Sequence, residues 1–329
     1  MRQVKLNFTY ESKDISADIK PFILGWSYTD FAHGKADNFT IDLEDKKGLW
    51  KDSWFPDKSA KIKSGINLND KNYKFGTFSI DEINLSGKPN KATIKAISAL
   101  ITKSLRGEKK SKSWENVTLK ELLQEISESH GLSYFYDADD ITFVRVDQVQ
   151  EPDLVFLKRL SSENGLNIKV CEEKIIIFSG KKYDEKSAFT TIDVNNSNVK
   201  IFNFSTKSHD IYKACQVSYW DSEKKNLISY TYYPDKSVDT GQILKKNLKC
   251  ESIAHAEKRA KSELRKKNKQ EITGNINMLG DVIFVSGLNI NVEGIGKLSG
   301  KYFIDESLHK QTRSAGYETA IKIRKVLDY

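Results

Sequence analysis

Alternating apolar and polar residues predict β-structure over the first third of the chain. Residues 38–45 read Asn-Phe-Thr-Ile-Asp-Leu-Glu-Asp, and alternation of this kind is typical of a strand with one buried face. The pattern recurs at residues 59–66, 73–85 and 92–100, with turn-forming glycines between the segments. Residues 1–102 are therefore predicted to form a first β-module.

Helical spacing replaces this alternation after residue 102. Thr118 and Glu121 form a capping box at the start of a predicted helix. The apolar residues that fall on one face of this helix are Leu119, Leu122, Leu123 and Ile126. A second helix is predicted to start at Asp153, which can cap it, and to end near Gly165.

Two strands are predicted after each of these helices, at residues 133–136 and 141–146 and then at 167–171 and 174–178. The acidic residues 137–140 are interpreted as a hairpin loop, and the basic residues 103–113 as a solvated interdomain linker. The two predicted units, each a helix followed by two strands, therefore differ from the all-helical repeats of a helical solenoid. Residues 103–195 are therefore predicted to be a small α/β insertion.

From residue 199 the pattern is that of strands again, with one helix among them. Ser252 can cap this helix, and its predicted buried stripe consists of Ile253, Ala256, Ala260 and Leu264. Lysines and arginines from Lys258 to Lys269 occupy the other faces, which is typical of a solvated helix with cations near its C-terminus. Residues 196–329 are predicted to form a second β-module with one helix.

One motif occurs in both β-modules. Residues 76–82 and 300–306 both read Gly-x-aromatic-x-Ile-Asp-Glu. Similar fragments precede it (64–66 and 286–288) and follow it (92–95 and 318–322). Gly76 and Gly300 are predicted to be equivalent turn positions, and the aromatic and isoleucine residues are predicted to be equivalent core positions. The motif residues of interest are Gly76, Phe78, Ile80, Gly300, Tyr302 and Ile304.

Composition limits the classes of protein that fit. The chain has 329 residues and a net charge of +8, from 53 Lys and Arg against 45 Asp and Glu. Because the two signs are interleaved, a solvated mixed surface is favoured over a basic nucleic-acid-binding face. No apolar run approaches the roughly 20 residues that span a bilayer. Residues 1–5 do not read as a signal peptide, which favours a protein kept in the cytosol or released by lysis.

Candidate catalytic chemistry is sparse. The three cysteines, Cys171, Cys215 and Cys250, form no metal-ligand pair and are predicted to be free thiols. The five histidines are too far apart for a ligand set, and no nucleotide-binding or hydrolase motif is present. We expect no enzyme activity, no cofactor and no metal. The aromatic cluster at residues 50–56 is interpreted as a packed loop lid.

The second module carries a further set of residues in a fixed order, from its helix to its last strands. They are Ala256, Arg259, Ala260, Gly274, Leu279-Gly280-Asp281, Val285-Ser286-Gly287, Gly300-Lys301-Tyr302-Phe303-Ile304, His309 and Gly316-Tyr317-Glu318-Thr319. With these residues the module resembles the late control protein D family, the baseplate hub proteins of contractile phage tails. Residues 151–160 resemble the entry into the family's middle domain, and residues 38–41 with 75–78 its opening barrel. The Tyr-rich segment 229–233 matches no pattern of the family. Gly316 and Thr319 join the motif residues as candidate sites.

This resemblance implies a mainly β fold, with two similar tube-type β-barrel modules flanking an α/β domain. It implies a homotrimer whose six related barrels form a pseudo-sixfold ring between a hexameric tail tube and a trimeric central spike. Baseplate wedge and tape-measure proteins are further implied partners, with no membrane, and DNA at most passes through the axial channel. The implied location is the baseplate of a virion or tail-like particle, assembled in the bacterial cytoplasm.

Three alternatives stay open at this stage. The particle could be an infectious phage, a tail-like bacteriocin or another contractile injection system. A nucleic-acid-binding module would require a clustered basic face. A hub-associated cell-wall hydrolase would require a further catalytic domain.

Overall fold

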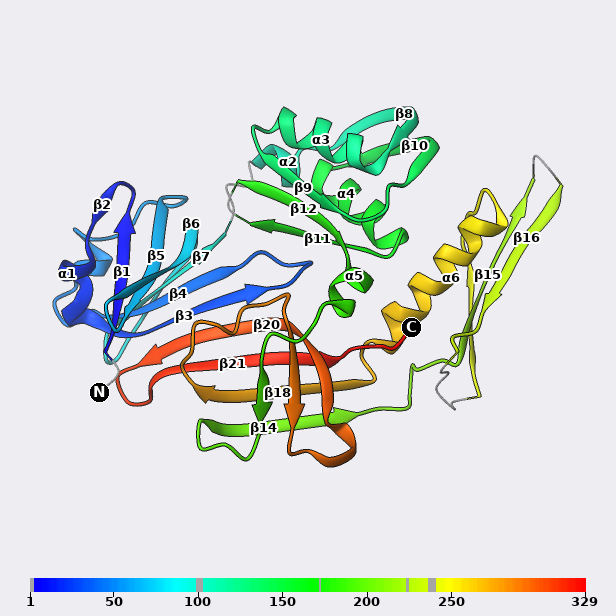
Figure 1. The fold of residues 1–329 in the computed structure, drawn as a ribbon. Helices are drawn as coiled ribbons and strands as arrows, with labels where there is room; N and C mark the ends of the chain where they lie inside the picture. The colour runs from blue at the N-terminus through cyan, green and yellow to red at the C-terminus, as the bar shows by residue number, and fades with distance from the viewer. Residues whose placement is uncertain (1–2, 99–102, 172, 223–224, 236–240) are drawn as a thin grey trace.

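The computed structural model describes residues 3–98, 103–171, 173–222, 225–235 and 241–329. Its main feature is one long, mostly antiparallel sheet that runs along the base of the molecule (Figure 1). In order across the sheet, its strands are β14 (Val199–Thr206), β18 (Ile272–Leu279), β21 (Gly316–Lys325), β20 (Gly300–Thr312), β3 (Ile23–Phe31), β4 (Asn38–Glu44), β7 (Lys91–Ile97), β6 (Lys71–Ser86), β5 (Lys61–Leu68), β1 (Val4–Tyr10) and β2 (Lys13–Asp14). Two further strands, β19 (Asn289–Glu293) and β13 (Thr191–Asp193), continue from β20.

The sheet joins what the sequence separates into two modules. Strand β3 of the first module pairs with β20 of the second, with Tyr28 opposite His309. Each half nevertheless has its own apolar core, one around Phe39 and Ile62 and the other around Tyr302. The alternation of single strands does not reveal that two strands almost 300 residues apart pair. The two halves of the long sheet are therefore joined by continuous hydrogen bonding.

Most strands of the first half coincide with the sequence prediction. Strand β4 matches the alternating segment 38–45, and β5, β6 and β7 match the segments at 59–66, 73–85 and 92–100 within a few residues. The end of the last predicted strand, at residues 99 and 100, lies outside the described residues. Figure 1 shows these strands in blue and cyan, with the insertion above the long sheet.

The insertion contains two small sheets and a core of its own. Its elements are α2 (Lys103–Gly107), β8 (Lys110–Thr118), α3 (Leu119–Ser129), β9 (Ser133–Asp137), β10 (Thr142–Glu151), α4 (Asp153–Glu163), β11 (Leu166–Cys171), β12 (Lys174–Ser179) and α5 (Gly180–Glu185). The capping box is confirmed, because the Glu121 amide donates to Thr118 Oγ1 at 3.2 Å. The predicted apolar face of α3 is buried against α4 and the two sheets.

Three details of the insertion differ from the prediction. The basic segment 103–113 is not a linker, since β8 begins at Lys110 and pairs with β10. Pro152, not Asp153, occupies the N-cap of α4. The buried Asp153 carboxylate instead accepts from Lys110 Nζ at 2.6 Å and lies 2.7 Å from His130 Nε2. Residues 138–141 form no hairpin, because β9 pairs with β12 whereas β10 pairs with β8.

Part of the predicted second module forms a separate unit. Strands β15 (Ala214–Asp221), β16 (Asn226–Tyr232) and β17 (Ile243–Asn247) form a sheet that packs against α6 (Ile253–Asn268). Figure 1 shows this unit at the right, beside the long sheet. Its core contains Cys215, Val217, Ala256, Ala260 and Leu264.

The helix of this unit follows the prediction except at Ile253, since Ser252 is its N-cap and Ala256, Ala260 and Leu264 are buried. Ser252 caps α6, because its Oγ accepts from the His255 amide at 3.1 Å. The predicted burial of Ile253 is wrong, since its side chain is 62% exposed. The apolar stripe that begins at Ala256 packs on β15 and β16, whose residues had been predicted to belong to the second β-module. The apolar stripe of α6 therefore serves a core that local patterning did not separate.

Buried ion pairs connect the insertion to the long sheet. Lys169 Nζ of β11 lies 2.7 Å from the carboxylate of Asp30 and 3.3 Å from that of Asp37. Burial raises the pKa of Asp37 to about 6. Burial opposes ionisation of Asp30 as well, but Lys169 and hydrogen bonds from Ser286 together outweigh it and lower the pKa of Asp30. On the other side, Asp184 of α5 accepts from Arg324 at 2.8 Å and from Arg265 at 2.8 Å. The insertion is thus held at both ends.

Candidate functional site

The repeated motif lies in the middle strand of a three-stranded unit in each half of the sheet. The first unit is β5, β6 and β7, and the second is β19, β20 and β21. Gly76 and Gly300 both have positive φ, at +131° and +143°, a conformation that side chains with a Cβ disfavour. Phe78 and Tyr302 are both buried.

The backbone around the two motif isoleucines follows one pattern. The amide of Ser59 donates to Ile80 O at 3.1 Å, and the amide of Gly287 donates to Ile304 O at 2.9 Å. In return, the Ile80 amide donates to the carbonyl of the residue after Ser59, Ala60, at 3.0 Å. The Ile304 amide donates to the carbonyl of the residue after Gly287, Leu288, at 2.9 Å. Ser59 and Gly287 also share a positive φ, +69° and +83°. Residues 59 and 287 therefore occupy equivalent positions.

This register corrects one part of the sequence comparison. Ser64 lies opposite Gly76, far along β5 from the bond to Ile80, whereas Gly287 bonds directly to Ile304. The fragments 64–66 and 286–288 therefore occupy different positions in the two units, although their residue types are similar. Strand pairing depends on hydrogen bonds that a short sequence match does not specify.

Both copies have the same irregularity after the isoleucine. The pairing of β6 with β7 shifts register between Ile80 and Glu82, and that of β20 with β21 shifts between Ile304 and Glu306, as at a β-bulge. The glutamate that follows pairs with a lysine of the next strand in each copy, Glu82 with Lys95 at 2.9 Å and Glu306 with Lys322 at 2.8 Å. The downstream fragments are thus equivalent at these lysines.

The bulged aspartates of the two copies have different environments. Asp81 is exposed, whereas Asp305 is largely buried, and burial raises the pKa of Asp305 despite the opposing effect of Arg324. Arg324 Nε lies 3.3 Å from Asp305, and the guanidinium stacks on Phe303 with 4.4 Å to the ring centroid. The same guanidinium binds Asp184. The second copy is therefore the one tied to the insertion.

Gly316 and Thr319 lie at the start of β21. Gly316 has a φ of +72° in the turn from β20. Thr319 is fully buried, and its Oγ1 accepts from the Asp281 amide at 2.9 Å and donates to the Asp281 carbonyl at 3.1 Å. Both residues therefore shape the loop and strand pairing of the second half, and neither is arranged for catalysis.

His309 marks the contact between the two halves, a role that no local pattern of the sequence predicts. Its Nδ1 lies 2.8 Å from Tyr317 Oη, and its Nε2 lies 3.2 Å from the Phe284 carbonyl. The imidazole stacks with Tyr28 and Phe75 of the first half. Burial lowers the pKa of His309 to about 4. It is therefore a neutral, structural histidine at neutral pH.

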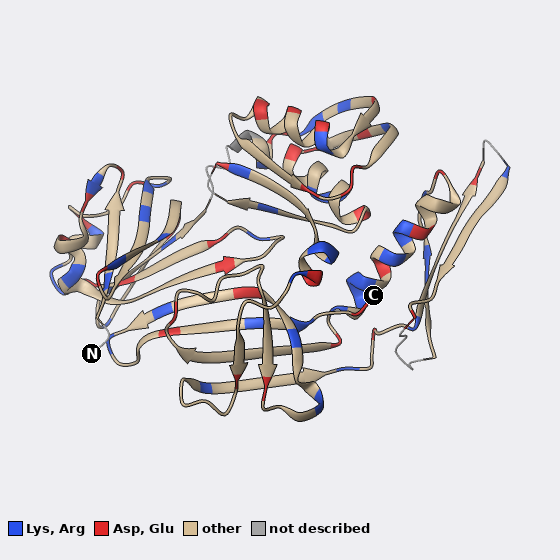
Figure 2. Ribbon diagram, in the orientation of Figure 1, with Lys and Arg blue, Asp and Glu red and all other residues tan. Residues whose placement is uncertain are grey.

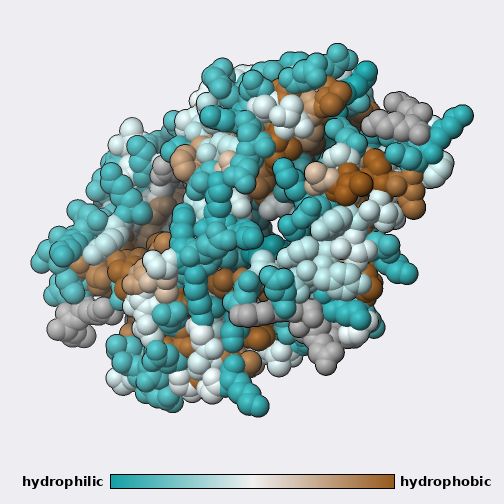
Figure 3. Space-filling model, turned by 45° about the vertical axis from the view of Figure 1, so that its right-hand side comes forward, coloured by the Kyte–Doolittle hydropathy of each residue, from teal (hydrophilic) through white to brown (hydrophobic). Residues whose placement is uncertain are grey.

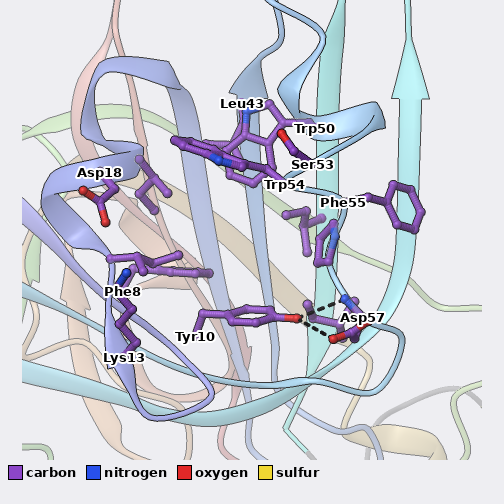
Figure 4. A pocket seen from close by; sticks show the side chains of 15 residues that line it. Phe8, Tyr10, Lys13, Asp18, Leu43, Trp50, Ser53, Trp54, Phe55 and Asp57 are labelled. Carbon is purple, nitrogen blue, oxygen red and sulfur yellow. Dashed lines mark hydrogen bonds between the residues drawn. The ribbon is translucent and has the colours of Figure 1, made fainter.

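An aromatic pocket of about 400 Å³ opens at the end of the first core (Figure 4). Its walls come from β1, from the short helix α1 (Ser16–Ile19) and from the loop 48–57. Tyr10 Oη accepts from the Asp57 amide at 3.0 Å and closes one side. Trp50 is buried, as expected for a packed lid, but Trp54 and Phe55 remain 38% and 46% exposed. No catalytic pair of side chains lines this pocket.

Within the described residues, no three His, Cys, Asp or Glu side chains lie close enough to hold a metal ion. Cys215 and Cys250 are buried free thiols, as the sequence predicts, and Cys171 is half-buried. Burial raises the pKa of Cys215 to about 11, which makes it a poor nucleophile. In the same part of the chain, no helix has the length and apolar character of a membrane span.

The fold is that of tail proteins of phages and prophages. A tail protein from Neisseria meningitidis MC58 superposes with a TM-score of 0.74 over 98% of this chain and 96% of its own, at 11% identity. The 43 kDa tail protein of prophage MuSo2 from Shewanella oneidensis gives 0.75 over 98% of both chains, at 13% identity. An E. coli component of the type VI secretion system gives 0.60 over 99% of this chain and 77% of its own, at 12% identity.

Sequence relatives point to one component of such tails. The chain is 30% identical over 175 residues to a probable baseplate hub protein of Escherichia phage 186, covering 51% of this chain and 43% of that protein. It is 28% identical over 185 residues to the corresponding protein of Escherichia phage P2, covering 52% and 46%. The chain therefore spans less than half the length of these curated relatives. No family model matches it. The resemblance to baseplate hub proteins is confirmed by these relatives.

Proposed function

We propose that this chain is a structural baseplate hub protein of a contractile phage tail or tail-like particle. The observation that carries the proposal is the similarity to two baseplate hub proteins, together with a fold shared with tail proteins over almost the whole chain. These relatives support a structural role and a location in the tail.

The two equivalent three-stranded units support a ring of pseudo-sixfold symmetry. Gly76 and Gly300, Ile80 and Ile304, and the lysine–glutamate pairs that follow occupy matching backbone positions. Three copies of a chain with two such units would present six related surfaces to a hexameric tube. The opposite face of the same ring would keep true threefold symmetry for a trimeric spike. Wedge and tape-measure proteins would contact its periphery and its channel.

The open edges of the long sheet support assembly through neighbours. Strands β14 and β2 end the sheet among the described residues, and β14 exposes Ile201 by 70% and Phe202 by 46%. An exposed edge with apolar side chains favours pairing with another chain. We therefore place β14 at a boundary between subunits or at a tail partner.

The assembly state tests this function. Three chains of 37.6 kDa give about 113 kDa, and light scattering of the protein with its spike partner should show a complex containing this mass. The spike protein alone provides the baseline. A chain that stays at 37.6 kDa in the presence of both spike and tube proteins would contradict the hub function.

A further inference from the structure

A cleft of about 480 Å³ lies between the insertion and α6. The end of α4, the start of α5 and one face of α6 line it. Eight lysine or arginine side chains face three aspartates in this lining, and we name it the cationic cleft. Figure 2 shows blue segments repeated along α6, and Figure 3 shows mainly hydrophilic residues on this face, with apolar patches between them.

Helix α6 packs on a sheet with one face and lines the cationic cleft with another. Its apolar stripe, which includes Ala260 and Leu264, packs on strands β15 and β16. Its residues that line the cleft recur every three or four positions, which is the spacing of one helical face. They are Lys258, Lys261, Ser262, Arg265, Lys266 and Lys269. The sequence analysis assigned these cations to solvent, whereas the fold aligns them along one cleft.

The chain neutralises only part of this charge. Asp184 pairs with both Arg265 and Arg324. Among the residues that the structure describes, Lys158, Lys258 and Lys269 make no ion pair, and Lys158 Nζ reaches only the Gly34 carbonyl at 3.4 Å. The three lysines face one cavity without forming an ion pair with a carboxylate. Lys158 belongs to α4, Lys258 to α6, and Lys269 directly follows α6.

These cations influence one another. His33 lies between them, and burial together with Lys269, Arg324 and Lys158 lowers the pKa of His33 to about 3. Burial, and then Arg324, likewise lowers the pKa of Lys269. Burial is the largest cause of both shifts, and repulsion from neighbouring cations adds to it. An anion placed beside Lys158, Lys269 and Arg324 would relieve that repulsion.

The lining favours carboxylates on a peptide over a nucleic acid. Among the residues that the structure describes, no Phe, Tyr or Trp lines the cleft, whereas single-stranded nucleic acids bind through aromatic stacking as well as charge. Ser162, Asn164 and Ser262 add neutral hydrogen-bonding groups that suit a peptide backbone. We propose that the cationic cleft binds an acidic peptide segment of a protein partner, with neighbouring Asp or Glu side chains on Lys158, Lys258 and Lys269. This proposal does not rest on the hub function.

A peptide titration of the isolated full-length chain tests the proposal. The probes are hexaglutamate, hexaglutamine and hexathymidylate, each with a fluorescent label. We expect hexaglutamate to bind best and to weaken as salt rises. The combined variant Lys158→Gln, Lys258→Gln and Lys269→Gln should bind it about tenfold more weakly, since three cations that face the bound carboxylates are lost.

A matched variant separates the cleft from net charge. Lys5, Lys63 and Lys74 are exposed on the first half, and their combined change to Gln removes the same charge. This control should bind hexaglutamate as the unmodified chain does. Equal losses in the two triple variants, or equal binding of hexaglutamate and hexaglutamine, would overturn the proposal.

Tighter binding of hexathymidylate than of hexaglutamate would also overturn it, in favour of a nucleic-acid site. If the triple variant does not fold, the single change Lys258→Glu at an exposed position provides the same comparison. It should weaken hexaglutamate binding, and unchanged binding would contradict the proposal. Because no tail partner is present, a failure of tail assembly leaves these outcomes unaffected.

Discussion

Individual residues carry the similarity between the two halves of the sheet. The two motif glycines share a φ that a Cβ disfavours, and the isoleucine and glutamate that follow make matching backbone and ion-pair contacts. The sequence identified Gly76, Ile80, Gly300 and Ile304 because identical letters recur at one offset. It did not identify the partner Ser59, since a serine with positive φ gives no pattern that resembles a glycine.

Replacement of Gly300 tests the strained backbone position. Gly300→Ala should destabilise the chain by about 1–3 kcal/mol, because a side chain at a φ of +143° is disfavoured. The added Cβ would meet Lys325 Cε at 3.4 Å, so crowding contributes little. Thermal unfolding measures the loss. Gly107→Ala is the control, because a Cβ there meets nothing within 4 Å; equal losses would contradict the account.

The buried histidine at the junction should make stability depend on pH. The folded pKa of His309 is about 4, against 6.5 for the free side chain. As pH falls from 6.5 to 4, the unfolded chain gains a proton that the folded chain does not, and stability falls by up to roughly 3 kcal/mol. Denaturant unfolding should show a smaller fall over this window in His309→Gln. An unchanged pH slope would contradict this role, and His209→Gln, at an exposed position, is the control.

Secondary-structure elements divide into those with strong local signals and those that tertiary contacts create. Helix α3 was predictable because a capping box and an apolar stripe coincide, and β4 because its alternation is regular. Strand β8 was not, because its lysines and serines read as a linker until β10 supplies the pairing. The unit of β15, β16, β17 and α6 has the same local patterns as a β-module, so only its separate core distinguishes it.

Whether the long sheet stays folded after the insertion is deleted should depend on helix α5. Excision of residues 105–179 with a flexible linker keeps Asp184, which binds both Arg265 and Arg324. Excision of residues 105–195 removes Asp184, which leaves Arg265 without this carboxylate and Arg324 with Asp305 as its acidic partner, and it also removes β13. We expect the chain without residues 105–179 to retain the β-signal in circular dichroism. We also expect it to melt at a higher temperature than the chain without residues 105–195. Equal behaviour of the two deletions would show that Asp184 does not stabilise the long sheet.

The open edge of β14 should be needed for assembly and not for folding. Ile201→Lys places a charge on an exposed edge position, which should block addition of a neighbouring strand while leaving the melting temperature of the isolated chain unchanged. Val149→Lys is the matched control, since Val149 is 67% exposed on the insertion. Light scattering with tail partners compares the two. Normal assembly of the Ile201 variant would remove β14 from the interface.

At the scale of the whole molecule, the mainly β class followed from the sequence, but the continuity of the sheet did not. Pairing of β3 with β20 requires contacts across almost the whole chain, and no short motif encodes such a contact.

A three-dimensional reconstruction of the assembled tail tests the hub assignment most directly. We predict three copies of this chain at the centre of the baseplate, with the motif units around Ile80 and Ile304 alternating at six equivalent positions beneath the tube. Absence of the chain from the baseplate would contradict the account. So would a different copy number, or an arrangement in which the two units face unrelated surroundings.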